Sequence, residues 1–138
     1  MLAPKKVKHK KWHRGDKIKG KATRMSKLNF GNYGLKSLQA GWISSRQIES
    51  ARRAITGHVQ RGAEVHIRIF PDKPITAKGN EMPMGKGKGA VDHYVAVVKP
   101  GTIMFEITGN DTKASKRALQ LAAYKLSVKT KIVGKELV

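Results

Sequence analysis

The clearest hydrophobic pattern along the chain is helical and covers residues 45–61. Apolar residues recur there at the three- and four-residue spacing of one helix face: Ile48, Ala51, Ile55 and Val59. Ser44 and Gln47 have capping-box spacing, in which each side chain binds the other residue's backbone. Gly62 is a typical residue just beyond a helix end. The pattern predicts an amphipathic helix with its apolar face on a core.

A second helical pattern covers residues 112–126, with Asp111 or Asn110 as the N-terminal cap. The predicted core face consists of Ala118, Leu119, Ala122 and Leu126. The polar side chains on the other face are Lys113, Lys116, Arg117 and Gln120. Two amphipathic helices of this length need a sheet or each other to cover their apolar faces.

Residues 63–70 alternate between apolar and polar, which predicts a half-buried strand that ends at Pro71 and Pro74. The inward residues are Val65, Ile67 and Ile69. The outward residues are Glu64, His66 and Arg68. The shorter apolar runs at 28–43, punctuated by glycines, predict short extended segments with turns.

Residues 92–98 and 102–108 flank Pro100-Gly101 and predict two strands joined as a hairpin. The buried side of the second would be Ile103, Phe105 and Ile107. Residues 128–133 alternate again and predict a last strand. The elements together predict an α+β domain over residues 28–138, a mostly antiparallel β-sheet with two packed helices.

Residues 1–27 differ from this domain, because eleven Lys or Arg residues stand there against one acid, Asp16. Large apolar residues are too few for a core, and ordering the segment costs about 25 kcal/mol of backbone entropy. Either the segment is a solvated tail, or it is ordered by phosphate contacts. Trp12, set among His9, His13 and Arg14, favours RNA, because aromatic and guanidinium planes stack on bases. The predicted RNA-binding residues are Lys5, Lys6, Lys8, Lys10, Lys11, Trp12, His13, Arg14 and Lys17.

The charge of the whole chain strengthens this prediction, because 29 Lys and Arg against 9 Asp and Glu give a net charge of +20. Nucleic acid is the commonest polyanionic partner of such a basic chain. Arg46, Arg53 and Arg61 lie opposite the core face of the first helix, with Arg52 at its edge, and are predicted to contact RNA backbone.

The sequence also excludes several classes of protein. A chain without Cys has neither disulfides nor Cys-ligated zinc. There is no long apolar run for a membrane and no apolar signal-peptide core at the start, so we expect no membrane partner and a cytoplasmic location. An organelle-encoded relative would have the same features.

The loop at residues 77–90 carries Met84, Gly85, Lys86, Gly87, Lys88 and Gly89. A mononucleotide loop is excluded, because five residues separate Gly79 from Gly85 and Gly87 stands where the magnesium-binding hydroxyl belongs. A dinucleotide loop is excluded, because its third glycine would come one residue early. The loop is either a flexible linker or a mobile arm. An arm whose lysines meet phosphates suits the Gly-Lys alternation better.

Catalytic and metal-binding constellations are not recognisable in the sequence. The acids are scattered without a close pair, and His9 and His13, at i and i+4, have cationic neighbours that repel a metal. We therefore expect no enzyme activity, no cofactor, no metal and no small-molecule substrate.

Six stretches, in order and at the right spacing, carry a resemblance to the bacterial form of the family of large-ribosomal-subunit protein sixteen, over about residues 1–133. They are the Pro-Lys-rich start with His13-Arg14-Gly15, Phe30-Gly31-x-x-Gly34-Leu35-Lys36, Arg46-Gln47-Ile48-Glu49-x-Ala51-Arg52-Arg53-Ala54, Phe70-Pro71-Asp72-Lys73-Pro74-Ile75-Thr76, Met84-Gly85-Lys86-Gly87-Lys88-Gly89 and Val98-Lys99-Pro100-Gly101.

The resemblance implies an α/β-hammerhead-like fold and binding to large-subunit ribosomal RNA beside the aminoacyl-tRNA site. It implies that the Gly-Lys loop reaches towards tRNA near the peptidyl-transferase centre, where RNA is the catalyst. The resemblance further implies neighbouring ribosomal proteins as partners and a location on cytoplasmic ribosomes. Many bacterial members carry an Arg, hydroxylated in some, where this chain has Pro83, so that modification is not expected here. The alternative function is a non-ribosomal nucleic-acid-binding architectural protein, although no helix-turn-helix pattern supports it.

Overall fold

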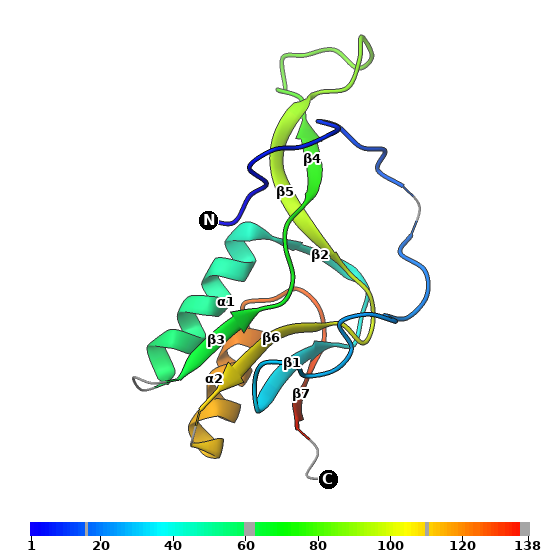
Figure 1. Cartoon of the computed structure of the whole chain (residues 1–138). Coiled ribbons are helices and arrows are strands. Elements are labelled where there is room, and N and C mark those ends of the chain that lie inside the picture. Colours follow the sequence, from blue (N-terminus) through cyan, green and yellow to red (C-terminus); the bar gives the residue numbers. More distant parts are fainter. Residues whose placement is uncertain (16, 60–62, 110, 136–138) are drawn as a thin grey trace.

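The computed structural model describes residues 1–15, 17–59, 63–109 and 111–135, and within these ranges the chain forms two helices and seven strands (Figure 1). In chain order the elements are β1 Tyr33–Ser37, β2 Gly41–Ser44, α1 Ser45–His58, β3 Glu64–Ile67, β4 Lys73–Ala77, β5 Ala90–Val98, β6 Ile103–Thr108, α2 Thr112–Ala123 and β7 Thr130–Gly134. The predicted α+β class is confirmed.

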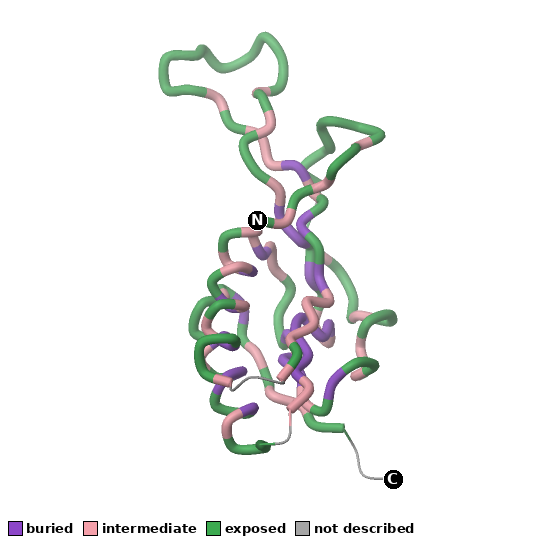
Figure 2. Tube along the Cα trace, turned by 60° about the vertical axis from the view of Figure 1, so that its left-hand side comes forward, coloured by how far each residue is buried: buried purple, intermediate pink, exposed green. Residues whose placement is uncertain are grey.

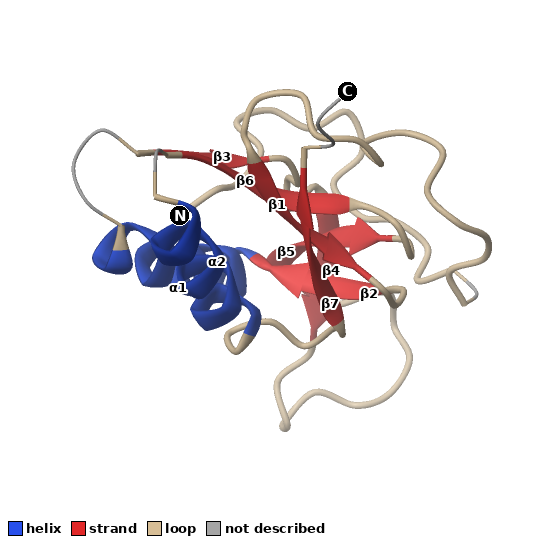
Figure 3. Cartoon of the chain, turned by 90° about the horizontal axis from the view of Figure 1, so that it is seen from below, coloured by secondary structure: helices blue, strands red, loops and turns tan. Residues whose placement is uncertain are grey.

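The strands belong to two sheets. One sheet has the order β3-β6-β1-β7 and the other the order β2-β5-β4, and every pairing in both is antiparallel. The two helices pack beside each other at one side of the strands (Figure 3). The antiparallel pairing agrees with the sequence prediction, whereas the division into two sheets was not predicted.

The predicted hairpin between residues 92–98 and 102–108 is wrong, because its two strands belong to different sheets. Val98 at the end of β5 lies opposite Gly41 of β2, and Ile103 at the start of β6 lies opposite Lys36 of β1. The strand boundaries themselves are close to the predicted ones.

A turn does form at Pro100-Gly101, with Gly101 at φ +97° and the amide of Thr102 donating to the carbonyl of Lys99 at 3.1 Å. The residues at and after the turn, however, are hydrogen-bonded to the end of β1 instead of to β5. The Gly101 amide donates to the Ser37 carbonyl at 2.7 Å, and the Ser37 amide donates to the Thr102 carbonyl at 2.8 Å. A local turn motif therefore could not reveal which strand would pair with β6.

Helix α1 begins as predicted and ends earlier. The Ser44 hydroxyl accepts from the Gln47 amide at 3.2 Å, and the Ser44 amide donates to the Gln47 side chain at 2.9 Å, so both halves of the capping box are present. The helix ends at His58 instead of residue 61, because Val59 is extended at ψ 150°. Gly57, which weakens a helix, lies in this last turn. The predicted stop at residue 62 lies outside the described residues.

Helix α2 also begins as predicted, with the Asp111 carboxylate accepting from the Ala114 amide at 3.1 Å. Asn110, the other candidate cap, lies outside the described residues. The helix ends at Ala123 instead of residue 126, because the amides of Lys125 and Leu126 bond three residues back instead of four.

Strand β4 was missed, because Pro74 was taken as the end of the preceding strand. That strand, β3, already ends at Ile67, and Pro74 lies inside β4. Proline is tolerated there because β4 is an edge strand, whose one side needs no partner. Since β5 begins at Ala90, the loop between β4 and β5 covers residues 78–89 and is shorter than predicted.

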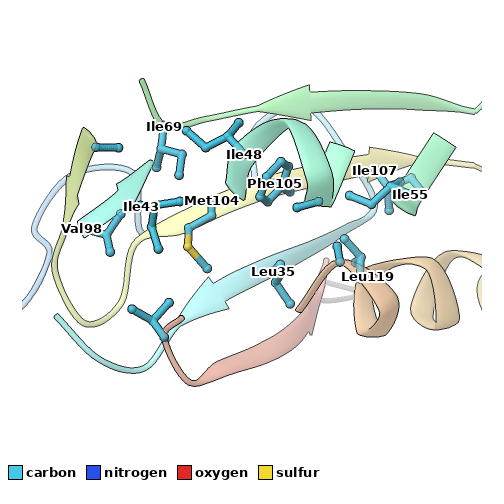
Figure 4. Close-up of a cluster of buried hydrophobic side chains, with 14 of the residues drawn as sticks. Leu35, Ile43, Ile48, Ile55, Ile69, Val98, Met104, Phe105, Ile107 and Leu119 are labelled. Carbon is cyan, nitrogen blue, oxygen red and sulfur yellow. The ribbon is translucent and has the colours of Figure 1, made fainter. Parts of the chain in front are cut away.

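One hydrophobic core joins both sheets to both helices (Figure 4). Strand β6 crosses its centre and is buried on both faces, so that Met104 and Glu106 are covered as fully as Phe105. Ile48 and Ile55 come from α1, and the other labelled core residues are Leu35, Ile43, Ile69, Val98, Ile107 and Leu119. The predicted buried side of residues 102–108 is thus correct but incomplete.

Candidate nucleic-acid interface

Strands β4 and β5 extend away from the core as an arm that carries loop 78–89 at its tip (Figure 1). The loop residues are mostly exposed, as Figure 2 shows, and Met84 is 96% exposed. The loop therefore presents its lysines to solvent at the point farthest from the helices.

The glycines of the loop are needed for two different reasons. Gly85 and Gly87 have φ values of +94° and +98°, which L side chains rarely adopt, and Lys86 between them also has a positive φ of 61°. At Gly89, a Cβ atom would lie 2.6 Å from the carbonyl oxygen of Ala77, so glycine lets the base of the loop close. The Gly-Lys alternation thus has a local conformational cause.

The structure brings the basic N-terminal segment to the base of this loop. The Lys11 ammonium donates to the carbonyl of Lys88 at 3.0 Å, and the Lys88 ammonium donates to the carbonyl of Trp12. A shallow hollow here is lined by His9, Lys11, Trp12, His13 and Lys88. Because 41% of Trp12 is exposed, its indole is accessible beside several cations. Residues predicted separately in the N-terminal segment and in the loop therefore share one site.

Lower on the arm, Lys73 of β4 holds the next part of the segment. Its ammonium donates to the Arg14 carbonyl at 2.6 Å and lies 4.5 Å from the ring centroid of Trp42. Lys17 lines a second hollow with Arg14 and Trp42. The sequence analysis singled out neither Lys73 nor Trp42 as functional, since one lay at a supposed strand end and the other in a short apolar run.

Residues 22–27 are fixed to the core by backbone contacts. The Ala22 amide donates to the Pro100 carbonyl at 2.9 Å, and the Ile103 amide donates to the Met25 carbonyl at 2.7 Å. At the other end, Leu2 packs against the core, and Figures 1 and 2 place the start of the chain beside α1. The lysines between, Lys5, Lys6, Lys8 and Lys10, are exposed.

The arginines of α1 lie on its solvent side, but two of them are held by an acid. Glu49 accepts from Arg52 through two bonds of 2.5 and 3.0 Å and from Arg53 at 3.2 Å. The pKa of the Glu49 carboxyl is lowered to about 2, chiefly by the hydrogen bonds from Arg52, which outweigh the effect of desolvation. Arg46 is exposed, and Arg61 lies outside the described residues.

Alternative kinds of site find little support in the described ranges. No group of three or more His, Cys, Asp or Glu side chains gathers there in a way that could hold a metal. Among the same residues, no helix combines the length and the apolar character needed to cross a membrane.

The fold and its extensions define a class: small, strongly basic α+β proteins with an irregular arm and a basic terminal segment lying against it. The family model described as ribosomal protein L16p/L10e matches residues 4–133. The chain therefore belongs to this family. It is a structural protein of the ribosome and not an enzyme, which decides against the alternative of a non-ribosomal architectural protein.

Curated relatives match over nearly their whole length. The large ribosomal subunit protein uL16c of Trieres chinensis is 56% identical over 133 residues, covering 96% of each chain. The protein of the same name from Phaeodactylum tricornutum is 56% identical and covers 99% of this chain and 98% of its own. The large ribosomal subunit protein uL16 of Karelsulcia muelleri is also 56% identical, over 98% of each chain. The ribosome is the location that these relatives have in common.

Proposed function

We propose that this ribosomal protein is a component of the large subunit and binds large-subunit ribosomal RNA through its N-terminal segment, helix α1 and the arm. Loop 78–89 then reaches past this contact towards tRNA in the aminoacyl site, near the peptidyl-transferase centre. Residues 1–27 act as the RNA-binding extension of the domain formed by residues 28–138. Large-subunit RNA, tRNA and neighbouring ribosomal proteins are the proposed partners.

The observation that carries the proposal is the contact between Lys88 and Trp12, which joins the basic segment to the base of the loop. A partner that binds along residues 5–14 would be guided directly to the arm. Lysine and arginine contacts to phosphate position RNA without reading its sequence, and an accessible indole adds stacking on an unpaired base.

The exposed arrangement of the loop supports a separate role for its tip. Met84 to Lys88 are all exposed, and the glycines give the backbone a shape that lets a phosphate approach closely. Lys86 lies between two glycines with positive φ and is exposed. This part of the chain can meet a ligand without disturbing the core.

Cosedimentation tests whether the protein associates with the large subunit at all. A tagged chain expressed in cells should migrate with large subunits in a sucrose gradient and remain with them at a salt concentration that removes loosely bound proteins. Its purified form should bind isolated large-subunit RNA. A chain that stays at the top of the gradient and does not bind the RNA would contradict the proposal.

A further inference from the structure

Phe30 is a large apolar side chain that is 61% exposed, although its backbone is rigidly held. The amides of Asn29 and Phe30 both donate to Oε1 of Glu106, at 2.7 and 3.2 Å. The carbonyl of Phe30 accepts from the Thr108 hydroxyl at 3.1 Å. The backbone amide and the backbone carbonyl of Phe30 are thus both hydrogen-bonded to side chains of the central strand β6, while the ring is exposed.

The residues that follow Phe30 are fixed equally closely. A Cβ atom on Gly31 would lie 2.6 Å from the carbonyl oxygen of Ile107, so only glycine allows the chain to approach β6 here. The Asn32 amide then donates to the same carbonyl at 2.9 Å. The position of Phe30 is therefore set by the fold before any partner arrives.

Two nitrogen-rich side chains flank the ring. His66 of β3 stacks on Phe30 with 5.2 Å between the ring centroids and 27° between the planes, and the guanidinium carbon of Arg68 lies 5.4 Å from the Phe30 centroid. Arg68 is itself held by Glu106 at 3.2 Å and by the Lys27 carbonyl at 2.8 Å. With both neighbours in place, Phe30 is still 61% exposed.

We propose that Phe30, flanked by His66 and Arg68, is a stacking site for an unpaired nucleobase of RNA. This inference rests on the proposed function and adds a second contact, because β3 and β6 lie at the opposite end of the molecule from loop 78–89 (Figure 1). Proteins recognise unpaired bases by stacking them on aromatic rings and on guanidinium planes. A preorganised ring loses little conformational entropy when a base binds.

The charge of the surroundings favours RNA over an apolar side chain of a neighbouring protein. Two acids pair with the flanking side chains: Glu106, which is buried and binds Arg68, and Glu64, which lies 3.6 Å from His66. Arg24 and Lys27 precede Phe30 in the chain and are exposed, so the phosphates on either side of a stacked base would meet positive charge.

The test compares variants for binding to isolated large-subunit RNA. Phe30→Ala should bind about 5- to 150-fold more weakly, the range found when a stacking aromatic is truncated. Phe30→Trp should restore affinity, whereas Phe30→Leu, which is apolar but cannot stack, should not. Since no charge is removed, the salt dependence of binding should keep its slope in all three variants. Tyr124→Ala is the matched control, because Tyr124 is 66% exposed and lies at the end of α2.

A Phe30→Ala variant that binds like the parent would overturn the stacking site while leaving the proposed function intact, and so would equal losses for Phe30→Ala and Tyr124→Ala. If the parent chain itself fails to bind, the proposed function fails instead. A photoreactive benzoylphenylalanine at position 30, irradiated in assembled subunits, should crosslink to an RNA nucleotide. A crosslink to another ribosomal protein would assign the ring to a protein contact and overturn the proposal.

Discussion

Arg68 and Glu106 form an ion pair of 3.2 Å in the interior of the protein, where their side chains are 8% and 0% exposed. The Glu106 carboxylate also binds two amides of the loop that precedes β1. Removing one partner of a buried pair leaves the other charge uncompensated, which typically costs about 3–5 kcal/mol.

We therefore expect Glu106→Ala to lower the free energy of unfolding by roughly that amount, about 3–5 kcal/mol, as measured by urea denaturation. Replacing both residues, as in Arg68→Met with Glu106→Leu, should cost less than the single change. Glu64→Ala is the control, since that side chain is 74% exposed. Equal stabilities of Glu106→Ala and the control would contradict the role assigned to the pair.

The net charge of +20 predicts steeply salt-dependent RNA binding. Each phosphate contact releases about 0.7–0.9 counterions, so roughly ten contacts would give a log–log slope of about −7 to −9. Filter binding or fluorescence titration across a salt series measures the slope. A flat response would rule out an electrostatic interface.

Substitutions in the basic segment and in the loop should impair different functions of the protein. Replacing Lys5, Lys6, Lys8, Lys10 and Lys11 by Ala should reduce assembly into large subunits, because these exposed lysines are the proposed phosphate contacts. The matched control removes the same charge from α2 and the region around β7, at the exposed residues Lys113, Lys116, Lys125, Lys129 and Lys131. If both five-residue variants lose assembly to the same extent, the total charge is responsible and not the position of the lysines. If neither variant loses assembly, the proposed phosphate contacts are contradicted.

Replacing Lys86 and Lys88 by Ala should leave the protein in the subunit and weaken the binding of tRNA in the aminoacyl site. The loop contributes little apolar contact to folding, and exposed phosphate contacts position a ligand without reading its sequence. Because Lys88 also binds the Trp12 carbonyl, Lys86→Ala alone separates an effect on tRNA from an effect on the basic segment. Loss of the double variant from the subunit, or unchanged tRNA binding, would refute the division of roles.

Glu49 predicts a specific effect of pH. Its pKa is about 2 in the folded protein against an ordinary value of 4.5, so the ionised form favours folding. The contribution is present above pH 4.5 and is lost as the pH falls through about 2. In parallel urea titrations, the difference in stability between the parent and Glu49→Gln should shrink over this interval. It should be small throughout, because Arg53 is 75% exposed and solvent screens the pairs. A difference independent of pH would contradict the assignment.

The sequence was most informative where structure is determined locally. The Ser44–Gln47 capping box and a cap at Asp111 or Asn110 follow from spacing alone, and the structure confirms the capping box and the cap at Asp111. The hairpin failed because a turn at Pro100-Gly101 does not specify the partner of β6, and that choice depends on hydrogen bonds to Ser37, far away in the sequence. Strand β4 was missed because a proline inside an apolar run usually argues against a strand, although an edge strand tolerates it.

The candidate site shows the same limit. Composition identified the basic segment, and glycine spacing identified the loop, but neither could place Lys11 and Trp12 against Lys88. The buried Arg68 was expected on the polar side of its strand, because its partner Glu106 lies in a different strand with an otherwise apolar sequence. Charge pairs between distant segments leave no spacing pattern that a single sequence can reveal.

The position of β1 between β6 and β7 has a consequence for the order of events during synthesis. The first strand to leave the ribosome that makes the chain finds its neighbours only among the last segments to emerge, so the central sheet cannot close until translation is nearly complete. The basic segment precedes β1 and needs no such partner to expose its charges. It can therefore meet RNA while the newborn protein is still being made, well before the body behind it has folded.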